Sequence, residues 1–97
     1  MKLVYSRQAL ADLEMIASYY AANASPAIAV SIRRRLLDVI DRTCRVPEAA
    51  PRVSQRSQVR VAAVVRYPFR IFYRVRADTI DILHIRHTSR RPWSGSR

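Results

Sequence analysis

Apolar and polar residues alternate along two neighbouring segments in the C-terminal half of the chain. In Phe69–Arg76 every second residue is apolar, and arginine recurs between them, FRIFYRVR. This period of two is typical of a half-buried strand with one apolar and one cationic face. Val59–Arg66 repeats the pattern. Its expected apolar face holds Val59, Val61, Ala63 and Val65, and its expected cationic side holds Arg60, Ala62, Val64 and Arg66.

A third segment, Thr79–His87, is apolar on both faces. Such a run predicts a central strand, with the two arginine-bearing segments as its neighbours. The dipeptides YP and AD separate the three segments, and such short connections predict an antiparallel three-stranded meander. On its apolar face we expect core residues, while the arginines between them stay accessible. The expected core residues are Ile71, Tyr73, Leu83 and Ile85, and the expected accessible ones are Arg70 and Arg74.

The N-terminal half predicts one strand and two helices. Lys2–Tyr5 is a short β-prone run, and Ser6 suits the N-cap of a helix over Arg7–Ala22. Ser25, followed by a proline, suits the N-cap of a second helix over Pro26–Arg45. Each helix is amphipathic and should bury one stripe only. The expected stripes are Leu10, Leu13, Ile16, Ala17 and Tyr20, then Ile28, Ile32, Leu36, Val39, Ile40 and Thr43, with Gln8, Asp12 and Tyr19 on the far side of the first helix.

The remaining segments predict connections rather than regular elements. Val46–Gln58 contains two prolines and no sustained period, which indicates a loop. Helices and a sheet that each own one apolar face stack on each other. The sequence therefore predicts an α+β, two-layer β-α-α-β-β-β domain: an N-terminal strand, and an αα-hairpin packed on a mainly antiparallel sheet whose arginine-bearing face stays open. We expect a single domain over residues 1–91 and a flexible basic tail over residues 92–97.

Composition indicates the size of the domain, the charge of its partner and the cellular compartment. Ninety-seven residues suffice for one small core. The formal net charge of +11 predicts an acidic partner, which charge alone does not identify as nucleic acid, anionic membrane or acidic protein. A single cysteine, Cys44, excludes an intrachain disulfide and suits a reducing compartment. No apolar run reaches membrane-spanning length and no signal-peptide core is seen, so we expect a cytoplasmic protein without a membrane partner.

Nearly the whole chain resembles the ParE/RelE superfamily of toxins from bacterial type II toxin–antitoxin pairs. The resemblance is most specific in YPFRIFYRV and IDILHIRHTSRRP, with the helix start Leu10-Ala11-x-Leu13-x-x-Ile16 as a weaker companion. It implies the β-α-α-β-β-β order that periodicity already predicts. It also implies a cognate acidic, ParD-like antitoxin that holds the toxin inactive.

Two branches of this superfamily differ in activity. RelE-like members are ribonucleases that cut mRNA on the ribosome, whereas ParE-like members are described as DNA gyrase inhibitors without an ascribed catalytic site. Arg70 matches a basic position of the RelE-like pattern. Thr88, however, stands where that branch tends to have arginine, and no tyrosine follows Tyr73. The resemblance thus favours the ParE-like branch, with no catalytic residues and no cofactor; the alternative ribonuclease would use Arg70, His87 and Arg90.

The two histidines offer little support for a metal site. His84 and His87 are three positions apart on a strand, so they point to opposite faces. No zinc-ligand spacing is present, and no metal is expected. His87 lies near the arginines, where an imidazole that titrates near neutral pH would suit a general base for RNA cleavage. The competing interpretation is a strand-end histidine that makes one hydrogen bond.

The arginines of the last three strands are either solvated or a binding face. We interpret them as binding because few acidic residues are interleaved to neutralise them. A tryptophan on a basic tail would likewise suit burial in a complex. The predicted residues for binding target or antitoxin are Arg60, Arg66, Arg70, Arg74, Arg90, Arg91 and Trp93. A third interpretation is a nucleic-acid-binding module that is not a toxin.

Overall fold

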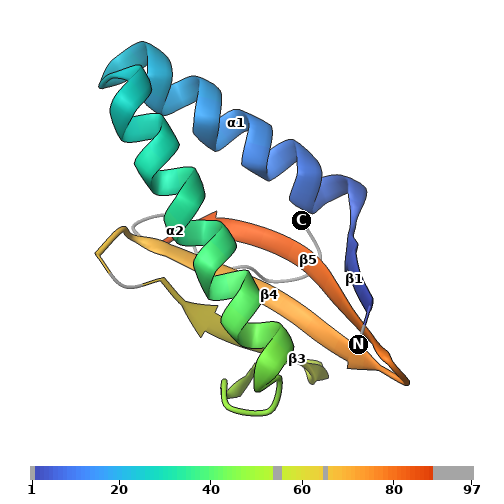
Figure 1. The fold of residues 1–97 in the computed structure, drawn as a ribbon. Coiled ribbons are helices and arrows are strands. Elements are labelled where there is room, and N and C mark those ends of the chain that lie inside the picture. The colour runs from blue at the N-terminus through green and yellow to red at the C-terminus, as the bar shows by residue number, and fades with distance from the viewer. Residues whose placement is uncertain (1, 54–55, 65, 89–97) are drawn as a thin grey trace.

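The computed structural model describes residues 2–53, 56–64 and 66–88. The predicted α+β class is confirmed: an N-terminal strand is followed by two helices that pack on a mixed sheet (Figure 1). The elements are β1 Lys2–Tyr5, α1 Arg7–Asn23, α2 Pro26–Arg45, β2 Arg52–Val53, β3 Arg56–Ala63, β4 Phe69–Arg76 and β5 Thr79–His87. The predicted tail, residues 92–97, lies outside the described residues.

The sheet has the order β1-β5-β4-β3-β2. The predicted antiparallel meander of β3, β4 and β5 is confirmed, and β1 joins β5 in parallel. The middle strand is β4 rather than β5, because the second edge of β5 is taken by β1 and not by β3. The segment predicted as a loop contains the short strand β2, which pairs with β3. Arg66 was expected in β3 but has a φ of 83°, a left-handed backbone that cannot continue a strand.

Both helices begin at the predicted serine caps. The Ser6 hydroxyl accepts a hydrogen bond from the backbone N–H of Ala9 at 2.9 Å. The Ser25 hydroxyl accepts one from Ile28 at 3.1 Å. Each cap satisfies one of the backbone donors that a helix N-terminus leaves without an intrahelical partner. The sequence therefore determines where both helices start.

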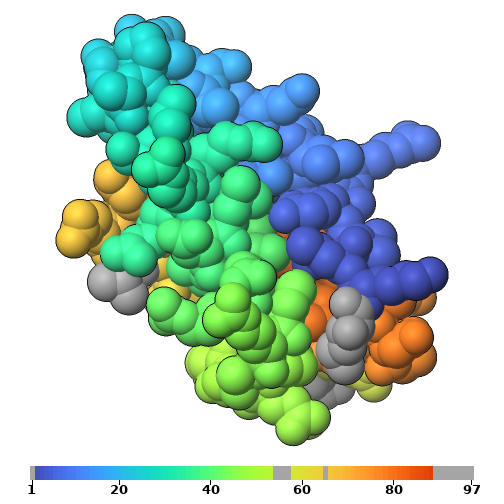
Figure 2. All heavy atoms as spheres, in the orientation of Figure 1, coloured from blue at the N-terminus to red at the C-terminus, as the bar shows by residue number. Residues whose placement is uncertain are grey.

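The core lies between the two helices and one face of the sheet. Space-filling spheres of α1 and α2 cover that face in Figure 2. The buried cluster comprises Ala9, Leu13, Ile32, Leu36, Val39, Ile40, Val64, Phe69, Ile71, Tyr73, Ile80, Ile82 and Ile85. Three helix predictions are wrong: Leu10 and Ile28 are exposed and Asp12 is buried. Because α1 contacts both α2 and β5, its buried surface does not follow one simple stripe.

The face assignment predicted for β3 is reversed. Arg60 pairs with Tyr73, and Val59 pairs with Arg74. Directly paired residues of antiparallel strands share a face, so Arg60 lies on the helix side with the buried Tyr73. Val59 lies on the arginine side, where it and Phe72 are nevertheless buried. The arginine side of the sheet is therefore not uniformly open, contrary to the prediction.

A β-bulge interrupts β5. Phe72 pairs with His84, but the next residue of β4, Tyr73, pairs with Ile82. Leu83 is therefore an extra residue in the ladder, and it is half-buried rather than part of the core. The irregularity shifts the alternation of β5 between its first and second halves. Periodicity alone does not reveal such a shift, because a run that is apolar on both faces has no alternation to interrupt.

Candidate functional site

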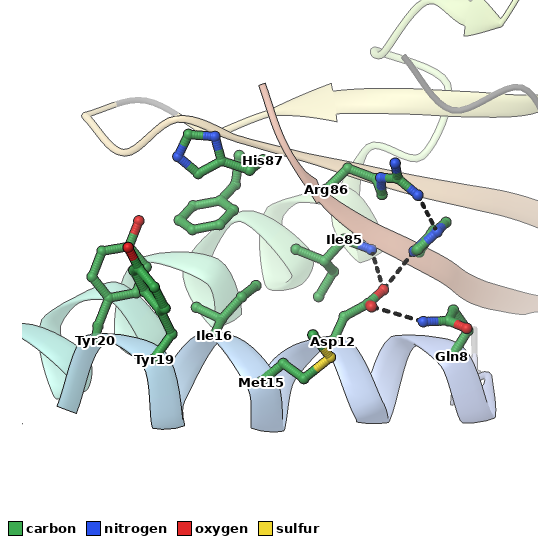
Figure 3. Close-up of a pocket in the computed structure, with 11 residues that line it drawn as sticks. Gln8, Asp12, Met15, Ile16, Tyr19, Tyr20, Ile85, Arg86 and His87 are labelled. Atoms are coloured by element: carbon green, nitrogen blue, oxygen red, sulfur yellow. Dashed lines mark hydrogen bonds and ion pairs between the residues drawn. The ribbon is translucent and has the colours of Figure 1, made fainter. Parts of the chain in front are cut away.

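A groove of about 550 Å³ lies between α1 and the C-terminal half of β5 (Figure 3). The last pair between β1 and β5 joins Tyr5 to Ile82. Beyond this pair, the helix α1 lies beside β5 in place of a strand. Much of the lining is apolar and comes from Met15, Ile16, Tyr19, Tyr20 and Phe69. Of these, Met15 and Tyr19 have exposed fractions of 65% and 56%, so the groove has an open apolar rim.

A buried carboxylate connects α1 to β5 inside this groove. Asp12 Oδ2 accepts a hydrogen bond from the backbone N–H of Ile85 at 2.9 Å and lies 2.5 Å from His84 Nδ1. Asp12 Oδ1 accepts a hydrogen bond from the amide of Gln8 at 2.9 Å. Three partners compensate for removing this carboxylate from water. Asp12 is therefore a structural link between the helix and the sheet edge.

The hydrogen bonds around His84 determine its tautomer. Arg86 Nη1 lies 3.1 Å from His84 Nε2. A guanidinium group can only donate, so Nε2 accepts from Arg86, and Nδ1 carries the proton that is donated to Asp12. The imidazole is neutral in this arrangement and relays a hydrogen-bond chain from the buried carboxylate to Arg86. Its Nε2 lone pair is occupied by Arg86, which does not favour a role as general base.

Ser6 fixes the beginning of α1 to the same edge. Its hydroxyl donates to the carbonyl of Leu83 at 2.8 Å, and its backbone N–H donates to the carbonyl of Ile82 at 2.9 Å. Ser6 and Asp12 thus bind neighbouring positions of β5 from successive turns of the helix. These contacts satisfy backbone groups that an unpaired strand edge would leave to water.

His87 and Arg70 lie on opposite sides of the sheet. His87 pairs with Phe69, and Arg70 pairs with Arg86. The His87 ring packs edge-on against Phe69 with 5.4 Å between the ring centroids, on the helix side. Arg70 is exposed on the other side. Of the residues that a ribonuclease would use, these two are not brought together, and Arg90 lies outside the described residues.

Asp81 neutralises part of the arginine side of the sheet. Its Oδ2 accepts hydrogen bonds from Arg76 Nε at 2.6 Å and from Arg74 Nη2 at 3.3 Å. Burial raises the pKa of the Asp81 carboxyl, but the hydrogen bonds and charges of Arg76 and Arg74 outweigh it and hold that pKa below its usual value. Arg74, predicted to be accessible, is consequently half-buried. Arg66 and Arg70 remain exposed.

Arg60 does not lie on the arginine side of the sheet but holds a loop in place. Its Nη1 donates to the carbonyls of Glu48 at 3.2 Å and Ala50 at 2.7 Å. Tyr73 donates its hydroxyl to the carbonyl of Pro47 at 2.5 Å in the same loop. Burial raises the pKa of the Tyr73 hydroxyl, and Arg60 opposes that shift. Both side chains hold the segment after α2, so the structure assigns Arg60 a structural role. The other predicted binding residues, Arg90, Arg91 and Trp93, lie outside the described residues.

Sequence reasoning overlooked the chain of Gln8, Asp12, His84 and Arg86. Gln8 and Asp12 were expected on the solvent side of α1, and Arg86 was not singled out. A local signal did exist, because residues four apart in a helix can form a glutamine–aspartate hydrogen bond. The contact between Asp12 and His84 spans 72 positions, and no local pattern identifies such a partner.

Two further observations concern the described part of the chain. No group of three or more His, Cys, Asp or Glu is placed there to hold a metal ion. Neither of the described helices is long and apolar enough to cross a membrane.

Comparison with known proteins places the fold. The family model for the ParE toxin of the type II toxin–antitoxin system parDE matches residues 3–92. A solved chain from the chromosomal ParDE TA system of P. aeruginosa superposes with a TM-score of 0.80, at 28% sequence identity, over 90% of this chain and 95% of that chain. No curated protein matches the sequence. Because the family model spans nearly the whole chain, the protein belongs to the ParE toxin family of type II toxin–antitoxin systems.

Proposed function

We propose that this toxin inhibits DNA gyrase and is held inactive by a co-encoded acidic antitoxin. The observation that carries the proposal is the family match over residues 3–92, since gyrase inhibition is the activity described for ParE-like toxins. The described geometry supports the same branch. Arg70 and His87, which a ribonuclease would need together, lie on opposite sides of the sheet, and His84 already shares its ring nitrogens with Asp12 and Arg86.

Charge supports an acidic antitoxin as the partner. The chain carries a formal net charge of +11, and among the described residues Arg66 and Arg70 are exposed. The similar solved chain comes from a ParDE system, which pairs two components. An antitoxin that brings carboxylates to the exposed arginines and apolar side chains to the groove would neutralise those charges and cover the open apolar rim.

A supercoiling assay with purified gyrase tests the proposal. The wild-type toxin is expected to inhibit supercoiling of relaxed plasmid DNA and to increase the amount of cleaved DNA trapped by gyrase. The acidic protein encoded in the neighbouring reading frame is expected to restore supercoiling when added first. A matched control is a relaxation reaction with an unrelated topoisomerase, which should proceed unchanged. Gyrase that remains fully active at toxin concentrations above that of the enzyme would contradict the proposal.

The same preparation distinguishes the alternatives. Ribosomes translating a defined message are incubated with toxin, and the message is examined for new ends. Intact message is expected. Ribosome-dependent cleavage, together with unaffected gyrase, would replace the proposed function with the ribonuclease activity. If neither reaction changes and no acidic protein is encoded nearby, the nucleic-acid-binding module becomes the better interpretation.

A further inference from the structure

We propose that the groove beside β5 recognises an apolar antitoxin segment with one acidic side chain at a fixed position, and that Arg86 is the residue that reads this carboxylate. The proposal rests on the proposed function, because it takes the occupant from the acidic antitoxin. It goes further by naming the side chain that determines specificity and the pair, Asp12 and His84, that positions it.

The first argument is the uncompensated charge of Arg86. Within the described residues its guanidinium bonds only to His84, which occupies one of its five N–H groups. Arg86 pairs directly across the ladder with Arg70, and like charges placed directly opposite destabilise a sheet. The buried carboxylate of Asp81, on the same side of the sheet, is bonded to Arg74 and Arg76 and not to Arg86. An incoming carboxylate would therefore relieve a repulsion and gain charge-assisted hydrogen bonds.

The second argument is that Arg86 is held in place before any ligand arrives. The neutral His84 presents Nε2 to Arg86 because its Nδ1–H is bonded to Asp12. Asp12 is in turn fixed by Gln8 and by the backbone of Ile85. A side chain that loses little conformational freedom on binding contributes more to affinity and specificity. Asp12 and His84 are thus positioning residues, and Arg86 is the contact residue.

The third argument concerns the chemistry of the remaining surface. Met15 and Tyr19 are exposed at 65% and 56%, and they line the groove together with Arg86. Apolar side chains of the ligand would cover these two residues. The N–H of Ile85, on the edge of β5, is already occupied by Asp12. A continuous backbone ladder is therefore blocked at this position, and recognition depends on side chains.

The experiment is a selection with a random-peptide phage library on the immobilised full-length toxin. Peptides enriched on the wild-type protein are expected to share an Asp or Glu at a fixed place beside apolar residues. On Arg86→Gln the apolar residues should persist and the acidic preference should disappear. Arg66→Gln changes an exposed arginine that does not line the groove, and it should retain the acidic preference. Circular dichroism and the thermal midpoint of each variant establish that it is folded.

A binding series with one enriched peptide gives the magnitude. Replacing its acidic residue by the neutral amide should weaken binding to wild-type toxin about tenfold, the value of one hydrogen bond to a charged group. The same replacement should leave binding to Arg86→Gln nearly unchanged. His84→Gln alters the support for Arg86, and it should reduce the tenfold preference without abolishing apolar binding.

Three outcomes would overturn this inference. They are the absence of enriched peptides on the wild-type toxin, an acidic preference that survives in Arg86→Gln, and acidic residues enriched equally at all positions, which would indicate unspecific charge attraction. Gyrase inhibition is measured in a separate reaction without peptide. If the toxin still inhibits gyrase and any of these three outcomes is found, the role of Arg86 in recognising a carboxylate is rejected. The proposed function then remains in place.

Discussion

Asp12 and Asp81 each join two elements of the molecule, and no local sequence pattern predicts these contacts. Asp12 joins α1 to the edge of β5, and Asp81 binds two arginines of β4. Both are buried. A buried carboxylate is costly unless its hydrogen bonds are satisfied, so each of these residues depends on its partners being in place. Removing one partner should therefore cost more than removing an exposed charge of the same type.

Asp81 makes the stability of the fold sensitive to acid. The pKa of its carboxyl is lower in the folded chain than the usual value of about 3.9 in an unfolded chain. The ionised group thus stabilises the fold above that unfolded pKa, and this contribution is lost as the pH falls through the lower folded pKa. Asp81→Asn should flatten the decline of the thermal midpoint below about pH 4.

The control for this prediction is Asp78→Asn, which alters an exposed aspartate in the adjacent turn. Its midpoint should follow that of the wild-type protein between about pH 2 and pH 6. If Asp81→Asn and Asp78→Asn respond to acid alike, the ion pairs of Asp81 do not contribute to the acid sensitivity.

Leu36 and Leu37 allow a test of the core with two adjacent residues of one type. Leu36 is 1% exposed, whereas Leu37 is 37% exposed. Leu36→Ala should lower the free energy of unfolding by about 2–5 kcal/mol through lost burial and a cavity. Leu37→Ala should cost less than about 1 kcal/mol. Denaturant unfolding measures the loss of unfolding free energy for both variants. Equal losses would mean that the buried face of α2 is assigned incorrectly.

At the scale of elements, Ser6 has two roles and Ser25 has one. Both hydroxyls accept a capping hydrogen bond, but only that of Ser6 also donates to a strand, at Leu83. Ser25→Ala should therefore cost about 1 kcal/mol of unfolding free energy. Ser6→Ala should cost about 2 kcal/mol, because the carbonyl of Leu83 also loses its donor. Equal losses in denaturant titrations would argue against the second role.

The elements that could be predicted are those with strong local signals. Serine caps and apolar periodicity were sufficient to place α1 and α2, and alternation was sufficient to place β4. The face of β3 was predicted wrongly because alanine and valine occupy both of its sides, so that only Arg60 and Arg66 distinguished the two sides. Arginine has a long side chain that can reach a loop carbonyl from the helix side, as it does here.

The candidate site was harder to predict than the fold. The arginines of β4 were identified, but their neutralisation by Asp81 depends on the register between two strands. The groove depends on where β1 stops, since α1 lies beside β5 only after the pair of Tyr5 and Ile82. Such features arise from tertiary packing, and a single sequence carries no periodic signal for them.

At the scale of the whole molecule, the net charge of +11 should dominate the rate of antitoxin association. Exposed charges are screened beyond about 8–10 Å at physiological ionic strength, so the on-rate should fall steeply as salt rises. Affinity should change much less, because apolar burial governs the off-rate. Stopped-flow mixing from low to high salt measures both rates. A constant on-rate would mean that the antitoxin binds away from the exposed arginines.

The parallel pairing of β1 with β5 sets the order in which this chain can fold during synthesis. The first strand finds its partner only among residues 79–82, and Ser6 reaches a carbonyl that lies 77 positions later. Contacts of such long sequence separation form late and slowly. The N-terminal strand and the β5 contacts of α1 must therefore wait until residues 79–87 have left the ribosome. A nascent toxin consequently has no native α1–β5 groove until β5 has been synthesised, and an antitoxin that recognises this groove cannot bind a shorter nascent chain.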